Sequence, residues 1–339
     1  MSKLSHTGAV ASLCCLPAIW ILFLAGCNTN PPVTPENPIP GTGRILVTAN
    51  VSDARIFLDG TETGRLTPDT LTASVGAHLV GLQKDGFLSD AQTVRVGSDS
   101  LTEAAFTLAQ AEQRVVLIED FSNVSCNPCV ASNLILEALV SGTYGRSKVA
   151  VVKYATNFPS PSDPFYVANR PDCDSRMSYY QILAAPTTIV DGVDRPTSTD
   201  SSAIKASIDA ALLQPARFKI SVRDSVVGGI YNIAVSVETI DTTGLDYQNL
   251  LLHTVITETE ITFPSPPGSN GETRFTDVMR AMLPSNTGEP LRPQNVGGTE
   301  QYSRTIPVNQ GWNTDHLHTV AFIQHAQTRV VYQSGSTFE

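Results

Sequence analysis

Two cysteines three residues apart, Cys126 and Cys129, are the strongest candidates for chemistry in this sequence of 339 residues. They stand in the stretch EDFSNVSCNPCVASN, residues 119–133. A Cys-x-x-Cys pair can exchange disulfides, form a structural disulfide or supply half of a metal site. Since the pattern alone fits all three uses, the neighbouring elements must distinguish between them.

The pair is expected at the junction between a buried strand and a helix. RVVLIED, residues 114–120, is almost continuously apolar, as a strand buried in a parallel sheet would be. Apolar residues then recur at helical spacing at Val130, Leu134 and Ala138. KVAVVKY, residues 148–154, predicts a second buried strand. Cys126 therefore lies at a helix N-terminus, where unpaired N–H groups and the helix dipole favour the thiolate.

The segment from about residue 112 to residue 215 resembles the thioredoxin superfamily. Asp120 stands six residues before the first cysteine, where that family keeps a buried acid. Lys153 falls where the family places a lysine near this acid. APTTIVDG, residues 185–192, matches the family's cis-proline strand, with Pro186 as the proline. The resemblance implies an α/β domain built around a thiol–disulfide exchange site.

The resemblance also implies a role for each of these residues. Cys126 would attack a substrate disulfide as the thiolate, and Cys129 would resolve the mixed disulfide. Asp120 would act as a base toward Cys129, with Lys153 tuning it. Pro186 would hold the backbone beside which a substrate strand pairs. No cofactor is implied.

The sequence also departs from the family's pattern. Ser125 replaces the tryptophan that usually precedes the first cysteine, and no histidine lies between the cysteines. A long insert, residues 157–181, separates the second strand from the proline. It carries Cys173, which is either a third redox thiol or an unpaired spectator, and the spectator is favoured.

Two rival uses of the cysteine pair stay open. A permanent Cys126–Cys129 disulfide would tighten the helix start, but closing so small a loop gains little entropy. A metal site is least favoured, because zinc takes about four ligands and only Cys173 and scattered histidines are at hand. His316 and His318 would share one strand face, yet packed or solvated histidines are favoured there. The sequence therefore predicts no metal.

Residues 1–26 predict an export signal. This stretch carries one charge, at Lys3, followed by a long apolar run. LAGC, residues 24–27, resembles the lipobox of bacterial lipoproteins, which implies a lipid on Cys27 and anchoring in the cell envelope, with the outer membrane preferred. The rival interpretation is an uncleaved transmembrane helix. The proline-rich residues 27–43 would then be a tether.

Alternating apolar residues predict β domains on both sides of the cysteine region. Residues 44–108 resemble the PEGA domain through IFLDGTETG and SVGAHLVGLQKDGF, which implies a spacer or binding module without chemistry. Residues 216–339 predict an antiparallel β-sandwich, in which the long excursion 263–290 could carry a binding function. After residue 111, VVLIEDFSNVSCNPC and HTVAFIQHAQTRVVYQS resemble the outer-membrane-protein-twenty-eight-related family.

The predicted fold is multidomain α/β plus all-β, with a thioredoxin-like α/β domain at residues 112–215 between a small N-terminal β-sandwich and a C-terminal β-sandwich. A formal charge of −10 without a basic stripe argues against nucleic acid as a partner. We predict a lipid-anchored envelope thiol–disulfide oxidoreductase whose partners are the membrane and exported thiol or disulfide proteins. The alternative is a non-enzymatic surface binding or structural lipoprotein with an idle disulfide. The sequence sets no oligomeric state.

Overall fold

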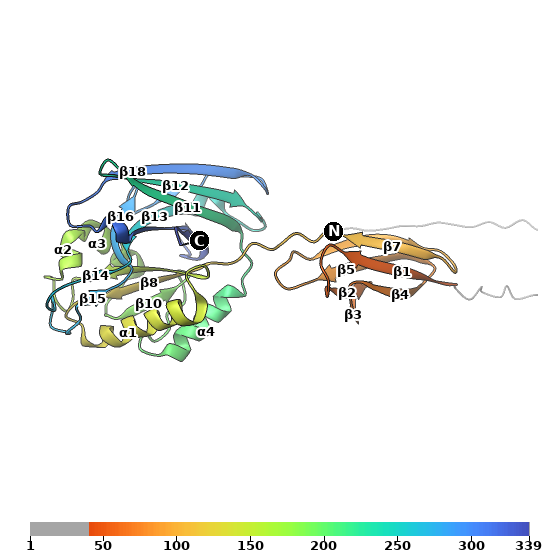
Figure 1. Cartoon of the computed structure of the whole chain (residues 1–339), viewed down its shortest axis with the longest axis horizontal. Helices are drawn as coiled ribbons and strands as arrows, with labels where there is room; N and C mark the ends of the chain where they lie inside the picture. The colour runs from red at the N-terminus through yellow and green to blue at the C-terminus, as the bar shows by residue number, and fades with distance from the viewer. Residues whose placement is uncertain (1–40, 339) are drawn as a thin grey trace, which may run out of the picture.

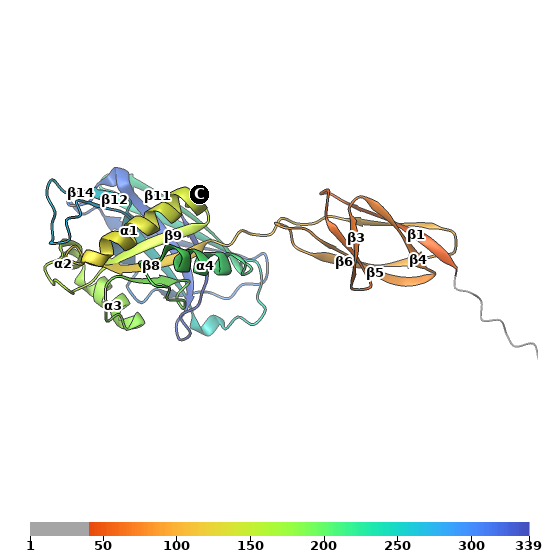
Figure 2. The same cartoon turned by 90° about the horizontal axis from the view of Figure 1, so that it is seen from below.

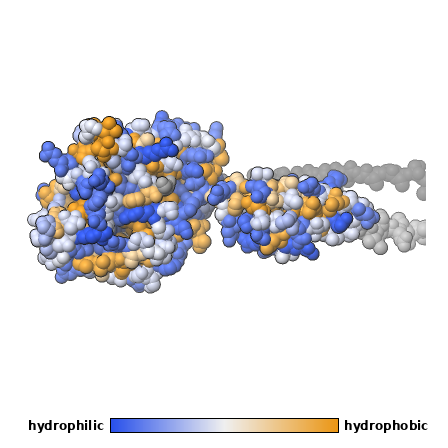
Figure 3. Space-filling view, viewed as in Figure 1, coloured by the Kyte–Doolittle hydropathy of each residue, from blue (hydrophilic) through white to orange (hydrophobic). Residues whose placement is uncertain are grey.

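The computed structural model describes residues 41–338, which form a small all-β body and a larger body of strands and helices (Figure 1). The predicted signal peptide of residues 1–26, the lipidation site Cys27 and most of the tether lie outside the described residues. Within residues 41–338, no helix has the length and apolar character needed to cross a membrane. Apolar and hydrophilic residues are interspersed over both bodies on the face shown in Figure 3.

The small body is a sandwich of two sheets, with strand orders β4-β1-β7 and β3-β2-β5-β6. Its strands are β1 (Thr42–Ala49), β2 (Arg55–Leu58), β3 (Thr61–Leu66), β4 (Asp69–Ser74), β5 (Gly76–Gln83), β6 (Asp90–Val96) and β7 (Leu101–Phe106). Alternate residues point inward, so Ile45, Val47, Val80 and Leu82 are buried in one core. Gly60 turns the chain between β2 and β3 with φ of 80°, a value that glycine adopts without steric cost.

The larger body is organised around a sheet in the order β10-β8-β9-β16-β13-β19-β20, with β17 pairing β13 beside this path. Its strands are β8 (Val116–Ser122), β9 (Val149–Ala155), β10 (Thr187–Val190), β13 (Leu250–Glu258), β16 (Val278–Leu283), β17 (Glu289–Pro290), β19 (Leu317–His325) and β20 (Val331–Ser336). β8 and β9 are parallel, and β10 runs antiparallel to β8. The carboxyl ends of β8 and β9 therefore meet at one edge, where the cysteine region begins.

Helices cover both faces of the β10-β8-β9 part of the sheet. On one face lie α1 (Asn127–Ala138) and α4 (Ser201–Leu212), seen in front of β8 and β9 in Figure 2. Ile118, Leu136 and Ile204 are buried between these helices and the sheet. α1 continues as a π-helical turn, Leu139–Tyr144, and α4 is capped by the side chain of Asp200. The predicted insert forms α2 (Pro164–Ala168) and α3 (Arg170–Tyr180) on the opposite face.

A second sheet, in the order β11-β12-β18, packs against the C-terminal strands of the large sheet. It consists of β11 (Phe218–Val227), β12 (Ile230–Thr239) and β18 (Thr299–Pro307). Phe218 and Val235 meet Leu252 and Ile323 in the core between the two sheets. A short hairpin, β14 (Ile261–Thr262) and β15 (Arg274–Phe275), and 3-10 turns at Tyr247–Asn249 and Thr314–His316 complete the body.

The predicted fold, a thioredoxin-like α/β domain between two separate β-sandwiches, is wrong. Lys153 N–H donates to the Asp277 carbonyl at 2.8 Å, which joins β9 to β16. Ser334 N–H donates to the Val115 carbonyl at 3.3 Å, so β20 returns toward β8. One hydrophobic core holds residues from Val115 to Val331. Unpaired strand edges are unfavourable, and here the C-terminal strands pair with the edge that the α/β segment would otherwise expose. One sheet thus contains strands from both the predicted α/β segment and the predicted C-terminal β-sandwich, and the larger body is rich in β-strands.

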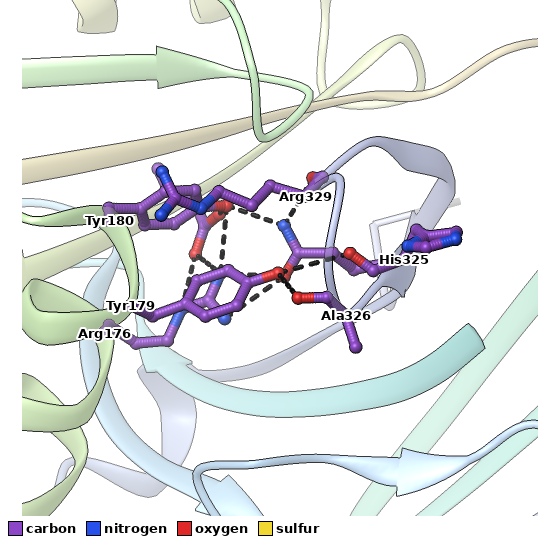
Figure 4. A network of polar contacts seen from close by, with 8 residues as sticks. Arg176, Tyr179, Tyr180, His325, Ala326 and Arg329 are labelled. Carbon is purple, nitrogen blue, oxygen red and sulfur yellow. Dashed lines mark hydrogen bonds and ion pairs between the residues drawn. The ribbon is translucent and has the colours of Figure 1, made fainter. Parts of the chain in front are cut away.

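A buried polar network ties the insert to this shared sheet. Arg176 of α3 donates through Nε to Glu119 of β8 at 3.0 Å, and Tyr180 donates its hydroxyl proton to the same carboxylate. Gln324 of β19 accepts from Arg176 Nη1 at 3.2 Å. Figure 4 shows Arg176, Tyr179 and Tyr180 facing the turn after β19, where the Tyr179 hydroxyl reaches main-chain carbonyls. Sequence reasoning did not single out these residues.

Candidate functional site: a covered disulfide above a buried acid

Cys126 and Cys129 form a disulfide at the start of α1, with their Cα atoms 5.3 Å apart. Cys126 is the N-cap residue in extended conformation, and Pro128 lies in the first helical turn, where its missing N–H leaves no helix bond unmade. Because α1 follows the carboxyl end of β8, the helix N-terminus and its dipole are directed at Cys126. The sulfurs thus occupy the position in which an attacking thiolate is stabilised.

A loop from the C-terminal part of the chain covers this disulfide. We call residues 264–273, between β14 and β15, the cover loop. Asn270 N–H donates to the Val124 carbonyl at 3.2 Å, and Asn270 Nδ2 donates to the Cys126 carbonyl at 3.4 Å. A Cβ atom added to Gly268 would lie 2.2 Å from the Val124 oxygen, so only glycine permits this approach. Cys126 is consequently 4% exposed and Cys129 0%, so the loop in this position leaves little room for a substrate to reach the sulfurs.

Asp120 is a fully buried acid on the face of the sheet that α1 covers. It alternates along β8 with Ile118, which packs beneath α1, so both side chains point to that helix. Thr188 of β10 donates to Asp120 Oδ1 at 2.8 Å, while Oδ2 has no hydrogen-bond partner among the described residues. Burial raises the pKa of Asp120 to about 6, against the opposing effect of Lys153. A carboxyl group with this pKa can take up and release a proton near neutral pH.

Lys153 lies directly beside Asp120 in the parallel register of β8 and β9. Its side chain is buried, and its Nζ donates to Asn133 Oδ1 and to Thr276 Oγ1, each at 3.1 Å. Neither acceptor carries a charge. Asp120 and Lys153 form no ion pair within 4.0 Å among residues 41–338. The positive charge of Lys153 nevertheless favours the carboxylate form of Asp120 and so opposes the effect of burial on the pKa of Asp120.

The cover loop continues this polar cluster. Asn133 of α1 donates through Nδ2 to Glu272 Oε1 at 2.8 Å, and Asn270 donates to Glu272 Oε2 at 2.6 Å. A chain of side chains thus runs from the loop to Lys153. Sequence reasoning missed Asn133, Asn270, Glu272 and Thr276. The one signal that pointed to part of this set was the length of the excursion at residues 263–290.

Pro186 follows a cis peptide bond from Ala185 and immediately precedes β10. β10 places Thr187 opposite Phe121 and Thr188 opposite Asp120. The five residues predicted from the sequence therefore fall in one region: Cys126, Cys129, Asp120, Lys153 and Pro186. β8, β9 and β10 carry or adjoin three of them, and α1 begins at the disulfide.

A cleft of about 450 Å³ opens beside the cover loop, between α1 and the ends of β8 and β9. Lys153 and Glu272 line it together with the apolar side chains of Val130 and Leu134. Leu134 is 63% exposed, so the predicted apolar stripe of α1 is wrong. The buried face of the helix instead carries Cys129, Ser132 and Leu136.

The remaining sequence candidates lie apart from the disulfide. Cys173 lies on the buried side of α3, on the opposite face of the sheet. Burial raises the pKa of its thiol to about 12, which keeps it protonated. His318 is buried beside Phe338, whereas His316 contacts the Glu260 carbonyl at 2.7 Å. Within residues 41–338, no three His, Cys, Asp or Glu side chains are grouped as a metal site requires.

Comparisons with known proteins add two findings. The family model of the PEGA domain matches residues 42–112, which form the small body and the start of its connection. HBP35 of Porphyromonas gingivalis has a similar fold, with a TM-score of 0.56 and 14% identity over 66% of this chain and 74% of that chain. No functionally curated protein matches the sequence.

Two further solved structures are more distant. A protein from Agrobacterium tumefaciens has a TM-score of 0.46 and 13% identity, over 67% of this chain and 95% of its own. A domain of the outer membrane lipoprotein Omp28 from Porphyromonas gingivalis has a TM-score of 0.25 and 18% identity, over 36% of this chain and 86% of its own. The chain thus contains a segment that matches the PEGA domain family, and over 66% of its length it is similar in fold to HBP35.

Proposed function

We propose that this protein exchanges disulfides with exported polypeptides through Cys126 and Cys129. The observation that carries the proposal is the placement of Asp120 beneath the helix that begins at the disulfide. Asp120 is a buried acid with a pKa of about 6, and its Oδ2 has no hydrogen-bond partner among the described residues. Perturbed acids of this kind are unfavourable for stability and are found preferentially at functional sites. The envelope location rests on the apolar run ending at LAGC and on the PEGA match.

The exchange reaction transfers two electrons in two steps. The Cys126 thiolate attacks one sulfur of a substrate disulfide, which forms a mixed disulfide and releases the other substrate sulfur as a thiolate. Cys129 then loses its proton and attacks Cys126 Sγ, which releases the second substrate sulfur and forms the Cys126–Cys129 disulfide. The substrate disulfide is reduced to a dithiol while the protein dithiol is oxidised. The reverse sequence oxidises a substrate dithiol.

Asp120 would accept the proton from Cys129. Its Oδ2 is the atom without a partner, and its pKa of about 6 leaves most of the group ionised at neutral pH. Lys153 would favour the return of Asp120 to the carboxylate form after Asp120 releases this proton to solvent. A general base whose pKa lies near the working pH is the effective one.

The cover loop must move before a protein substrate reaches the sulfurs. Its contacts with the cysteine region are the hydrogen bonds of Ser269 and Asn270 and the packing of Gly268 against Val124. A polypeptide that reaches the sulfurs would take the place of the loop. The substrate class is therefore an extended exported chain carrying cysteine, rather than a small thiol alone.

The alternative function is a non-enzymatic envelope protein in which the disulfide fastens the start of α1. The burial of both sulfurs favours it, because an idle disulfide needs no access. Under this alternative the cover loop is a permanent part of the fold, and Asp120 has no proton to exchange.

The reduction potential of Cys126–Cys129 separates the two functions. The full chain with Cys173→Ala is equilibrated against defined thiol–disulfide buffers, and the Cys129→Ala variant is incubated with a peptide containing a disulfide. A potential of roughly −120 to −270 mV and a trapped mixed disulfide on Cys126 support exchange. A potential below about −300 mV with no trapped adduct leaves the idle disulfide.

A further inference from the structure

Glu272 is the charged residue that connects the cover loop to the acid beneath the disulfide. It is held at both carboxylate oxygens, by Asn133 Nδ2 at 2.8 Å and by Asn270 Nδ2 at 2.6 Å. Asn133 accepts from Lys153 Nζ at 3.1 Å, and Lys153 stands in register with Asp120. Asn270 also donates to the Cys126 carbonyl at 3.4 Å. A single side chain of the loop thus contacts Asn133, which binds Lys153, and Asn270, which binds the backbone of Cys126.

We propose that Glu272 is a positioning residue of the exchange site: through Asn133 and Lys153 it makes the protonation of Asp120 depend on whether the cover loop is closed. The inference rests on the proposed function for its purpose, although the electrostatic coupling itself does not require exchange. Glu272 touches neither the sulfurs nor the acid, so it acts at a distance, through its charge and through the side chains that it holds.

The sign of the coupling follows from the charges around Asp120. Lys153 from β9 favours its carboxylate form, and Glu272 from the loop disfavours it. β10 contributes the neutral Thr188, and α1 contributes the neutral Ser132. When the loop opens, Glu272 leaves with it while Lys153 stays on β9. Asp120 then ionises more readily, and it can accept the Cys129 proton at the moment when a substrate occupies the place of the loop.

The closed cover loop has the opposite effect on Asp120. With Glu272 in place, the pKa of Asp120 is higher than when the loop is open, so a larger fraction of the group is protonated near pH 6. Asn270 meanwhile holds the backbone of Cys126. The same loop that keeps substrates from the disulfide therefore also lowers the fraction of Asp120 that is ionised. This arrangement limits exchange to occasions when a polypeptide has displaced the loop.

Titration of Asp120 in the oxidised full chain tests the coupling without any need for exchange activity. The carboxyl carbon of Asp120 is followed by NMR from pH 4 to 8 and assigned with Asp120→Asn. Glu272→Gln removes the charge and keeps an acceptor for Asn133. Glu260→Gln, which removes a carboxylate paired with Arg274 on the neighbouring hairpin, is the matched control. We expect Glu272→Gln to lower the pKa of Asp120 by about half a unit or more, and Glu260→Gln to shift it by less.

A second variant separates charge from position. Glu272→Ala removes the hydrogen bonds as well, so it should both lower the pKa of Asp120 and speed reduction of the disulfide by a small dithiol. An unchanged titration in Glu272→Gln, or an equal shift in Glu260→Gln, overturns the inference. If the titration shifts but no mixed disulfide forms, the coupling stands and the proposed exchange function fails.

Discussion

Asp120 and Lys153 stand opposite each other on the parallel strands β8 and β9, with both side chains on the face that α1 covers. The lysine is satisfied by Asn133 and Thr276 rather than by a direct ion pair with the aspartate. Burial therefore prevails over the neighbouring positive charge, and the pKa of Asp120 rises instead of falling. The ionised form of Asp120, which predominates at neutral pH, therefore lowers the free energy of unfolding of the protein.

Asp120→Asn should stabilise the larger body, and the gain should grow with pH. The pKa of Asp120 is about 6 in the folded protein against an ordinary value of 3.8, so the unfolded chain loses the proton first. The stability of the wild type therefore falls as pH rises from about 4 to about 6. Asparagine does not ionise and can still accept from Thr188. The free energy of unfolding of the variant should therefore exceed that of the wild type by about 2–3 kcal/mol above pH 7.

Denaturant unfolding from pH 4 to pH 8 measures this difference. The fluorescence of Trp312, the only tryptophan among the described residues, reports the larger body. A difference between Asp120→Asn and wild type that stays constant across this range would contradict the raised pKa.

Gly268→Ala should expose the disulfide. The new Cβ would lie 2.2 Å from the Val124 carbonyl oxygen, so the cover loop must shift away from the cysteine region. Such overpacking costs about 1–3 kcal/mol, which corresponds to about a tenfold faster reduction by a small dithiol if the loop gates access. The control is Gly142→Ala, where the added carbon meets nothing within 4 Å. Equal reduction rates in both variants would show that the loop does not limit access.

The local arrangement around the disulfide follows from the sequence, because it depends on patterns within about forty residues. The apolar runs at 114–120 and 148–154 are β8 and β9, and strand alternation places Asp120 and Lys153 on one face. The helix between them has Cys126 as its N-cap residue, as its proline and the strand end indicate. Such short-range patterns are set by backbone geometry, so the sequence predicts this local structure without knowledge of distant contacts.

The cover loop and the sheet order depend on contacts that no local pattern encodes. Asn270 and Glu272 lie more than 130 residues beyond the cysteines, in a loop without periodicity. The second partner of β9, beside β8, is β16, and this pairing is selected by tertiary packing rather than by the composition of either strand. Leu134 fits an apolar helical stripe, but no element covers it, since α1 borders the cleft at that point. The predicted fold class is wrong for the same reason, because it places β9 and β16 in separate folds.

Arg176→Met should destabilise the larger body strongly. Arg176 is the buried partner of Glu119, so its loss leaves a carboxylate enclosed by protein without a compensating charge. Removing one partner of a buried pair costs about 3–5 kcal/mol. Lys205→Ala, which breaks the exposed pair with Asp209, is the control and should cost less than about 1 kcal/mol. Unfolding midpoints followed at Trp312 compare the two variants, and similar losses would mean that the buried pair contributes no more than a surface one.

His318→Asn should reduce the loss of stability in acid. Burial and the nearby Arg146 lower the pKa of His318 to about 3, against an ordinary value of 6.5. The unfolded chain therefore binds a proton near pH 6.5 that the folded protein does not bind, and stability falls as the pH decreases from 6.5 toward 3. Asparagine removes this penalty while keeping a polar atom near Thr337, so the variant should gain about 2 kcal/mol relative to wild type between pH 8 and pH 5. The value at pH 8, where the histidine is neutral in both states, isolates the packing cost of the substitution. If the two proteins lose stability in parallel over this range, the neutral form of His318 is not what makes the fold sensitive to acid.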